Sequence, residues 1–227
     1  MPRSGATHSF PLERLMTSVF PLLAQARQLP LIAILRGLKP EEALDIGQAL
    51  YEAGFRTLEV PLNRPGAIEC IAALAGGLGA DALIGGGTML TVAHVEAVHA
   101  AGGRLMVSPN CEPAVIRRAV ELGMLAAPGV ATPTEAFAAL AAGAHALKLF
   151  PAESLGHGGL KALKSVVPTG TDLWPVGGIT PESIGPWVKA GATGFGIGSQ
   201  LYAPGVTAAQ VQDRASAYVQ AWQATKA

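Results

Sequence analysis

A lysine lies inside an apolar segment of this chain where a buried strand is expected, and lysine can form covalent bonds with carbonyl compounds. The segment reads His145-Ala146-Leu147-Lys148-Leu149-Phe150-Pro151. Removing an ammonium group from water is costly unless the group is paired or loses its proton. A lysine nucleophile at pH 7 needs a pKa about 3 units below its usual value of roughly 10.4, and burial is one way to achieve this. The structural alternative is an ammonium that reaches solvent or pairs with a carboxylate.

Glu59 is the candidate partner of Lys148. In residues 57–62 apolar side chains stand at every second position, which leaves Glu59 on the opposite face. The same alternation in residues 145–150 separates Lys148 from Leu147 and Leu149. If the apolar faces pack on helices, both charges point into one interior. The pair is then either a buried ion pair, which desolvation makes weakly stabilising at best, or a lysine nucleophile with a carboxylate that moves protons.

Arg36 and Thr88 stand where further binding groups are expected. Arg36 ends the apolar segment 31–36, where its planar guanidinium could bind a substrate carboxylate or phosphate. Its alternatives are solvent exposure or pairing with Glu41 or Glu42. Residues 85–88 read Gly-Gly-Gly-Thr, so a small ligand could approach the backbone and the Thr88 hydroxyl, although such a glycine run is also typical of a tight turn.

Two glycine clusters late in the chain favour phosphate binding. They are residues 176–180, which include Gly177 and Gly178, and residues 194–200, which include Gly198 and Ser199. Loops after the seventh and eighth strands of a β/α barrel commonly bind phosphate through backbone N–H groups. The alternative is that glycine is tolerated there only because the strands crowd one another.

These residues must be positioned by a regular alternation of strands and helices. Strands are expected near residues 31–36, 57–62, 82–86, 104–108, 124–127, 145–150, 172–176 and 193–197, with Ala-rich helical segments between them. Eight such units predict an α/β fold of the (β/α)₈ TIM-barrel type, although an open doubly wound sheet shares the same pattern. Residues 1–10 are expected to be a flexible tail. An additional helix near 12–28 precedes the first strand, and residues 11–227 form one domain.

Composition argues against several classes of function. The chain has 227 residues, 50% of them hydrophobic, and a formal net charge of zero, so neither nucleic-acid nor membrane binding is expected. Only two cysteines occur, Cys70 and Cys111, which favours a reduced, cytoplasmic protein. The histidines lack metal-ligand spacing, and no metal is expected. His157 follows the sixth strand and could touch a substrate.

Several segments resemble a known family, the 2-keto-3-deoxy-6-phosphosugar-acid aldolases of the KDPG/KHG type. The likeness spans about residues 30–205, in order and at the family's spacing. The segments that carry it are Leu58-Glu59-Val60-Pro61-Leu62-Asn63, Gly85-Gly86-Gly87-Thr88, Ser108-Pro109-Asn110, Pro128-Gly129-Val130-Ala131-Thr132, Leu147-Lys148-Leu149-Phe150-Pro151 and Val176-Gly177-Gly178-Ile179.

The resemblance implies a class I aldolase, a lyase that works through a Schiff base without metal or organic cofactor. It implies a (β/α)₈ barrel and a cytoplasmic homotrimer that acts on a small phosphorylated keto acid in carbohydrate metabolism. Carried over by resemblance, the Schiff-base lysine is Lys148 and the general acid/base is Glu59. The remaining matches are Arg36 and Thr88 around the pyruvate carboxylate, Pro109 and Phe150 as pocket walls, and Gly177, Gly178, Gly198 and Ser199 as phosphate loops.

Three positions resemble the phosphogalactonate branch of that family. Where the phosphogluconate enzymes have Leu-Glu-Val-Thr-Leu-Arg and Thr-Gly-Gly, this chain has Pro61, Asn63 and Val176. A valine cannot make the hydrogen bond that a threonine hydroxyl offers to a sugar hydroxyl, so Val176 is expected to affect which C4 epimer is accepted. The expected reaction is cleavage of 2-dehydro-3-deoxy-6-phosphogalactonate in an Entner-Doudoroff-type galactonate catabolism. The alternatives are the phosphogluconate epimer, both epimers, or a non-covalent phosphosugar isomerase or epimerase that uses Glu59 as a base.

Overall fold

The computed structural model of the chain describes residues 21–226, in which parallel strands alternate with helices from the first strand to the last. The strands are β1 (Leu31–Ile34), β2 (Thr57–Pro61), β3 (Leu83–Gly87), β4 (Leu105–Val107), β5 (Leu125–Ala127), β6 (Gly129–Val130), β7 (Ala146–Leu149), β8 (Asp172–Pro175) and β9 (Phe195–Ile197). The helices are α2 (Ala43–Glu52), α3 (Ala67–Gly77), α4 (Val92–Ala100), α5 (Pro113–Glu121), α6 (Pro133–Ala141), α7 (Ala152–Lys164), α8 (Pro181–Ala190) and α9 (Ala208–Ala224), with a short 3-10 helix η1 (Pro40–Glu42) before α2.

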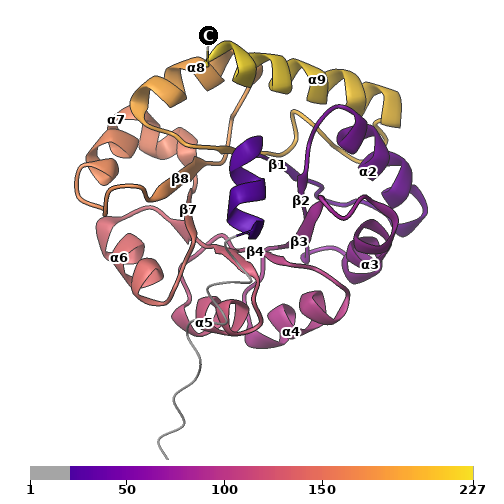
Figure 1. Cartoon of the computed structure of the whole chain (residues 1–227), viewed down its shortest axis with the longest axis horizontal. Helices are drawn as coiled ribbons and strands as arrows, with labels where there is room; N and C mark the ends of the chain where they lie inside the picture. The colour runs from indigo at the N-terminus through magenta and orange to yellow at the C-terminus, as the bar shows by residue number, and fades with distance from the viewer. Residues whose placement is uncertain (1–20, 227) are drawn as a thin grey trace, which may run out of the picture.

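The strands curl into a ring with the helices outside it, as Figure 1 shows. Six strands pair in the order β5-β4-β3-β2-β1-β9 and three in the order β6-β7-β8. A parallel bridge between Val176 and Gly196 joins the two sheets on one side, and the His145 amide donates to the Ala126 carbonyl (2.9 Å) on the other. The parallel, curled α/β architecture predicted from the sequence is therefore confirmed.

The fifth strand lies where it was predicted, at Leu125–Ala127, but the structure adds a second short strand, β6, that the sequence analysis did not predict. Pro128 lies between β5 and β6. A proline has no N–H group to donate to a strand ladder, so the pairing is interrupted at that residue. Its carbonyl still accepts from the Lys148 amide at 2.9 Å, which keeps the segment beside β7.

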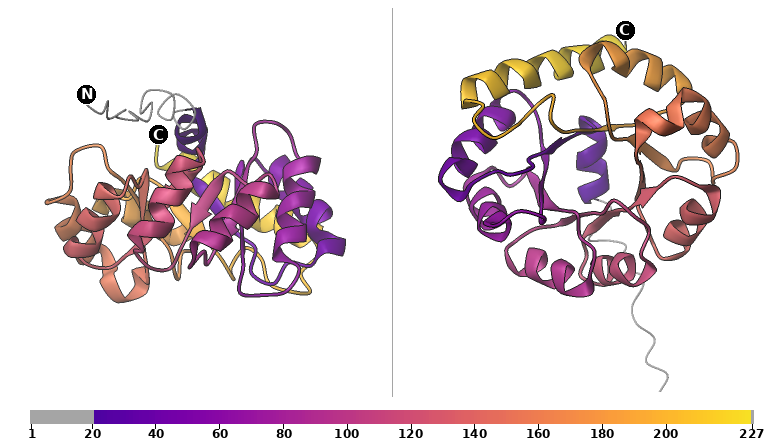
Figure 2. Two further views of the ribbon diagram at one scale, coloured as in Figure 1. Left: turned by 90° about the horizontal axis from the view of Figure 1, so that it is seen from below. Right: turned by 180° about the vertical axis from the view of Figure 1, so that it is seen from behind.

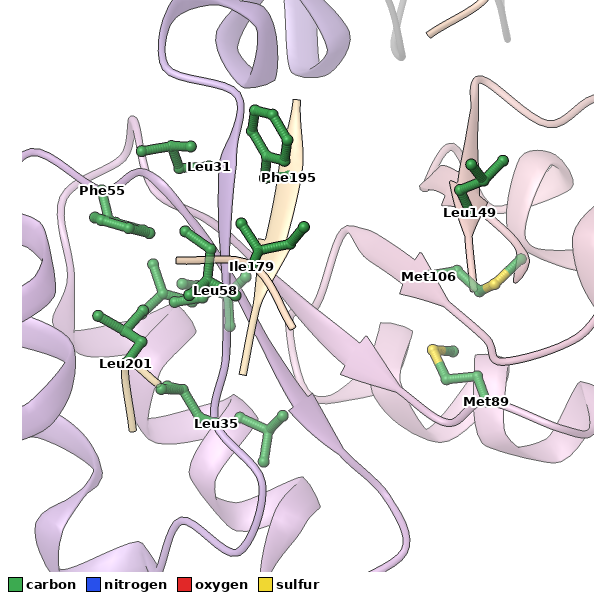
Figure 3. Packing of buried hydrophobic residues seen from close by; sticks show 14 of the residues in the cluster. Leu31, Leu35, Phe55, Leu58, Met89, Met106, Leu149, Ile179, Phe195 and Leu201 are labelled. Carbon is green, nitrogen blue, oxygen red and sulfur yellow. The ribbon is translucent and has the colours of Figure 1, made fainter. Parts of the chain in front are cut away.

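Side-chain alternation along the strands gives the ring two separate apolar regions. Outward side chains such as Leu58 and Leu149 pack against the surrounding helices, and Figure 3 shows them with Leu31, Met106 and Phe195. A second set fills the inside of the ring, made up of Ala26, Ile32, Leu83, Leu105, Val107, Leu125, Ala127, Ala146 and Trp174. The period of two in β2 and β7 is confirmed, and it sends Glu59 and Lys148 to the inside of the ring.

Residues 21–28 are helical and close one end of the ring, where Figures 1 and 2 show this indigo helix across the opening. Ala26 is buried among the interior side chains, and the Arg27 guanidinium forms a salt bridge with Asp172 (2.7 Å) at the start of β8. The Gln25 amide donates to the Asp81 carbonyl just before β3. This helix therefore covers the N-terminal ends of the strands. The predicted tail at 1–10 and the first part of the predicted helix lie outside the described residues.

Capping residues mark the ends of several helices. The Thr132 hydroxyl accepts a hydrogen bond from the Glu135 amide, and the Glu135 carboxylate accepts one from the Thr132 amide. Pro133 occupies the first turn of α6. Gly191 ends α8 with φ 115°, a conformation that side-chain-bearing residues rarely adopt. Gly156, with φ 63°, kinks α7 soon after its start. No helix within residues 21–226 is long and apolar enough to cross a membrane.

Candidate active site

Glu59 and Lys148 share one small space inside the ring. Glu59 is 2% exposed on β2 and Lys148 is 8% exposed on β7. The space that both side chains line has a volume of about 10 Å³, and Val107, Trp174 and Ile34 form parts of its wall. It is large enough for about one water molecule. Within the described part of the chain, Glu59 Oε2 has no hydrogen-bond partner and no salt bridge joins the two residues.

Burial moves the pKa values of both groups toward neutrality. Desolvation raises the pKa of Glu59 to about 7, although the charges of Lys148 and Arg36 oppose the shift. Desolvation also lowers the pKa of Lys148, and the nearby Arg36 adds to this effect while Glu59 opposes it. The pair therefore holds a carboxyl that can exchange protons near pH 7 and an amine that loses its proton more readily than usual.

Gly87 at the end of β3 makes room for the Glu59 carboxylate. A Cβ atom on this residue would lie 2.7 Å from Glu59 Oε1 and still nearer to Oε2. The φ angle of Gly87 is not positive, so this glycine leaves space for the carboxylate rather than adopting a special backbone conformation. The glycine run 85–88 was interpreted as an approach for a ligand, and the structure shows that its third glycine accommodates the carboxylate of Glu59.

A larger cavity of about 350 Å³ opens at the C-terminal ends of β1, β7, β8 and β9. It shares Ile34, Val176 and Gly196 with the inner space, so the two are contiguous. Seven of the residues selected from the sequence line it: Arg36, Phe150, Val176, Gly177, Gly178, Gly198 and Ser199. Active sites of β/α rings lie at this end of the strands.

The aromatic ring of Phe150 lies between the two spaces. The ammonium nitrogen of Lys148 is 5.0 Å from the centroid of that ring, within the range of a cation–π contact. Phe150 itself lines the outer cavity. A ligand in the outer cavity would therefore reach Lys148 past Phe150 and Val176.

Glu153 is a carboxylate in this cavity that the sequence analysis did not select. It lies in the first turn of α7, against the glycine loop that follows β8, and a Cβ atom on Gly178 would lie 2.6 Å from its Oε1. The Ala152 amide donates to the Val176 carbonyl (3.0 Å), which fixes the start of α7 against that loop. In the sequence, Glu153 could have been selected as a site residue because it follows closely after the strand that carries Lys148.

The comparisons with known proteins agree with this geometry. The model of the KDPG and KHG aldolase family matches residues 22–217. The chain belongs to this family.

Members of the KDPG and KHG aldolase family resemble the chain over most of its length. It is 50% identical over 195 residues to the probable 2-dehydro-3-deoxy-6-phosphogalactonate aldolase of Rhizobium meliloti (strain 1021), covering 86% of this chain and 92% of the relative. The 2-dehydro-3-deoxy-6-phosphogalactonate aldolase of Escherichia coli (strain K12) is 47% identical, with 86% and 95% covered.

Solved structures of family members share the fold. A structure described as native KDPGal superposes with a TM-score of 0.86 at 46% identity, covering 88% of this chain and 97% of that one. The KDPG aldolase of Legionella pneumophila, with pyruvate captured as a covalent carbinolamine, has a TM-score of 0.75 at 29% identity, covering 90% and 97%.

Two residues matched to the aldolase family line neither of the two spaces described above. Thr88 directly follows Gly87 and is partly buried, and its φ of 53° is unusual for a β-branched residue. Pro109 follows β4 and contacts the backbone of Gly129, where the absence of a Cβ atom permits the approach. His157 also lies away from the cavity, because its ring packs edge-on against Trp187 with centroids 4.3 Å apart.

Within residues 21–226, no group of three or more His, Cys, Asp or Glu side chains is arranged to hold a metal ion.

Proposed function

We propose that this chain is a class I aldolase that cleaves 2-dehydro-3-deoxy-6-phosphogalactonate to pyruvate and D-glyceraldehyde 3-phosphate. The observation that carries the proposal is the burial of Lys148 and Glu59 in one space, with both pKa values moved toward neutrality. Two titratable groups with such environments can divide nucleophilic and proton-transfer roles at neutral pH. The substrate follows from the two relatives at 50% and 47% identity, which carry this activity in their names.

The first half of the mechanism uses the neutral amine of Lys148. Its nitrogen attacks the 2-keto carbon, and the carbinolamine loses water to give an iminium that can accept an electron pair. Burial lowers the pKa of Lys148 and so increases the fraction of free amine available for this attack.

The second half uses the carboxylate of Glu59. Acting directly or through one water, it removes the proton of the 4-hydroxyl, and the oxygen forms the aldehyde carbonyl as the C3–C4 bond breaks. The electron pair of that bond forms a C2–C3 double bond, and the iminium nitrogen takes up its own π pair to give an enamine. After glyceraldehyde 3-phosphate leaves, Glu59 returns the proton to C3, and hydrolysis of the iminium releases pyruvate. A carboxyl with a pKa of about 7 is suited to both directions of transfer.

The proposed binding roles of Arg36, Phe150 and the glycine loops are supported by their positions around the outer cavity, and those of Thr88 and Pro109 by the family resemblance alone. We assign the substrate carboxylate to Arg36 and Thr88 and the walls of the pyruvate pocket to Pro109 and Phe150. The phosphate is assigned to the backbone of the loops that contain Gly177, Gly178, Gly198 and Ser199, which line the same cavity as Arg36. The scaffold we propose is one (β/α)₈ barrel domain with an additional N-terminal helix, in which β5 and β6 form one interrupted strand.

Trapping experiments test the covalent step. Incubation with pyruvate and borohydride should add a reduced pyruvyl group to Lys148, located by peptide mass spectrometry. An adduct elsewhere, or none, would contradict the mechanism and favour a non-covalent isomerase or epimerase. The variant E59Q should still form some adduct but lose most of the cleavage, and unchanged turnover would remove Glu59 from the mechanism.

The choice of epimer is tested at Val176, which lines both the inner and the outer space. The native chain should prefer the phosphogalactonate substrate to its phosphogluconate epimer. Adding a hydroxyl with V176T should move the ratio of the two kcat/KM values toward phosphogluconate by about tenfold. If the ratio of the two kcat/KM values were the same in V176T and the native protein, Val176 would not determine which epimer is preferred.

We also propose a cytoplasmic homotrimer. Both cysteines of the described chain are free, which suits a reducing compartment. Exposed apolar side chains at Leu44, Leu90, Val92, Phe137 and Val166 offer surface that subunit contacts could bury. One structural relative, with 46% identity and a TM-score of 0.86, is a cage designed by fusing symmetric oligomeric domains. Light scattering should give about three times the 23.1 kDa of the chain.

A further inference from the structure

Tyr202 lines the outer cavity and is tied to a residue far away in the sequence. Its hydroxyl donates a hydrogen bond to Glu42 Oε1 at 2.7 Å. The Tyr202 side chain is 1% exposed and Glu42 is half-buried, so the contact is partly shielded from solvent. Burial and the neighbouring carboxylate raise the pKa of Tyr202, which keeps the hydroxyl protonated as a donor.

The Glu42 side of this contact belongs to the loop that carries Arg36. Glu42 Oε1 also accepts from the Lys39 amide at 3.2 Å, and the Glu42 amide donates to the Lys39 carbonyl at 3.2 Å. The Leu38 amide donates to the Leu35 carbonyl, next to Arg36. These bonds make residues 35–42 one ordered loop after β1, with Arg36 near one end and Glu42 at the other.

The Tyr202 side belongs to the loop that carries Gly198 and Ser199. The Leu201 and Tyr202 amides both donate to the Gly198 carbonyl, at 2.8 and 3.1 Å, so residues 198–202 form a closed turn. The two loops also touch directly, because a Cβ atom on Gly37 would lie 3.1 Å from Pro204 Cγ. Gly37 has φ 81°, which itself favours glycine at this contact.

We infer that the Tyr202–Glu42 hydrogen bond is a positioning contact that sets the separation between Arg36 and the Gly198–Ser199 turn, and thereby the length of substrate that the cavity accepts. The inference rests on the proposed function, in which Arg36 binds the carboxylate end and the turn binds the phosphate end. A substrate that spans both ends gains from loops already held at the right separation. A molecule that contacts only one of the two loops gains little binding energy from their fixed separation.

The experiment compares Y202F with a matched tyrosine elsewhere. Y202F removes one hydroxyl and keeps the ring that fills the cavity wall. Tyr51 also donates to a carboxylate, Asp81 Oδ1 at 2.6 Å, and lines neither of the two spaces of the site, so Y51F is the control. Each protein is assayed with the phosphorylated keto acid, with the same keto acid lacking its phosphate, and for borohydride trapping of pyruvate.

For the phosphorylated substrate, Y202F should raise KM about tenfold, the scale of a lost hydrogen bond to a charged group, with a smaller change in kcat. The kcat/KM for the substrate without phosphate and the trapping rate should change less than about twofold. Y51F should match the native protein in all three assays. An equal loss for both keto acids, or no loss with Y202F, would overturn the inference.

Variants at Glu42 test whether the two residues act as a pair. E42A should reproduce the Y202F phenotype, and the double variant should be no worse than either single one, whereas independent effects would multiply. E42Q keeps an oxygen that can accept the hydrogen bond from the Tyr202 hydroxyl, so its KM should stay close to that of the native protein. Multiplying effects would refute the pairing. Failure of the native protein to form any pyruvate adduct would instead refute the proposed function.

Discussion

Replacing Gly87 by alanine should separate imine formation from proton transfer. The added Cβ atom would lie 2.7 Å from Glu59 Oε1 and closer to Oε2, whereas ordinary contact begins near 3.4 Å. Oε1 must therefore retreat by about 0.7 Å and Oε2 by more. Lys148 lies across the ring on β7, and the three atoms nearest to the new methyl group all belong to Glu59.

The expected loss follows from this displacement. Misplacing a reacting group by about 1 Å can cost about 100-fold in rate, and general acid–base catalysis contributes about 100- to 10,000-fold in total. We therefore expect G87A to lower kcat for cleavage by about 100-fold. Borohydride trapping of pyruvate on Lys148 should fall much less, because it does not require the Glu59 carboxylate at its native position.

Three assays distinguish the steps in G87A: aldol cleavage, borohydride trapping, and exchange of the pyruvate methyl protons with deuterium, which reports protonation of the enamine. The matched control is G86A on the same strand, whose new Cβ atom would press on Val98 and Met89 outside the ring, at 2.8 and 2.9 Å. It should lower the thermal midpoint without a selective loss of proton exchange. If G87A retained native exchange and cleavage, the assignment of Glu59 would be refuted.

The remaining predictions concern pH, backbone conformation and charge. With a Glu59 pKa of about 7, kcat/KM should rise about tenfold per pH unit below pH 7 and level off above it; a profile flat from pH 5 to 8 would contradict the base role. The pKa of Glu59 in the folded protein lies above its ordinary value of 4.5, so this carboxyl favours folding below pH 4.5 and loses the contribution as the pH rises through 7. Urea unfolding should thus find E59Q more stable than the native protein by up to about 3 kcal/mol at pH 8 and equal to it near pH 4. At Thr88, which has φ 53°, T88G should be more stable than T88A by about 1 kcal/mol in the same assay, while both raise the pyruvate concentration needed for trapping; equal stabilities would argue against strain there. Because the Glu153 carboxylate lies against Gly178 in the proposed phosphate loop, E153Q should lower KM for the phosphorylated substrate about threefold, and an unchanged KM would show that this charge is screened by solvent.

Much of the site was predictable because strands have a period of two and parallel β/α units place their carboxyl ends together. Those two rules were sufficient to point Glu59 and Lys148 into the same interior and to bring the late glycine clusters to the rim near Arg36. The family assignment made from six short segments is confirmed by the match over residues 22–217. The short strand β6 was not predictable in the same way, because only its pairing with β7 in the folded ring continues the ladder beyond the interruption at Pro128.

The sequence by itself determined the local properties of the chain: the alternation of strands and helices, the face on which each charged residue stands, and the glycines where loops need them. These depend on neighbours a few positions away. Only the tertiary structure decided which distant residues touch: that Gly87 leaves room for the Glu59 carboxylate, that Glu153 lies against the loop after β8, and that Tyr202 bonds to Glu42. Such contacts depend on how the ring closes and on the space left between side chains of different strands, which no local pattern encodes. The lowered pKa of Lys148, on which the proposed chemistry depends, was likewise decided by the tertiary structure, because it arises from the burial that the whole ring provides.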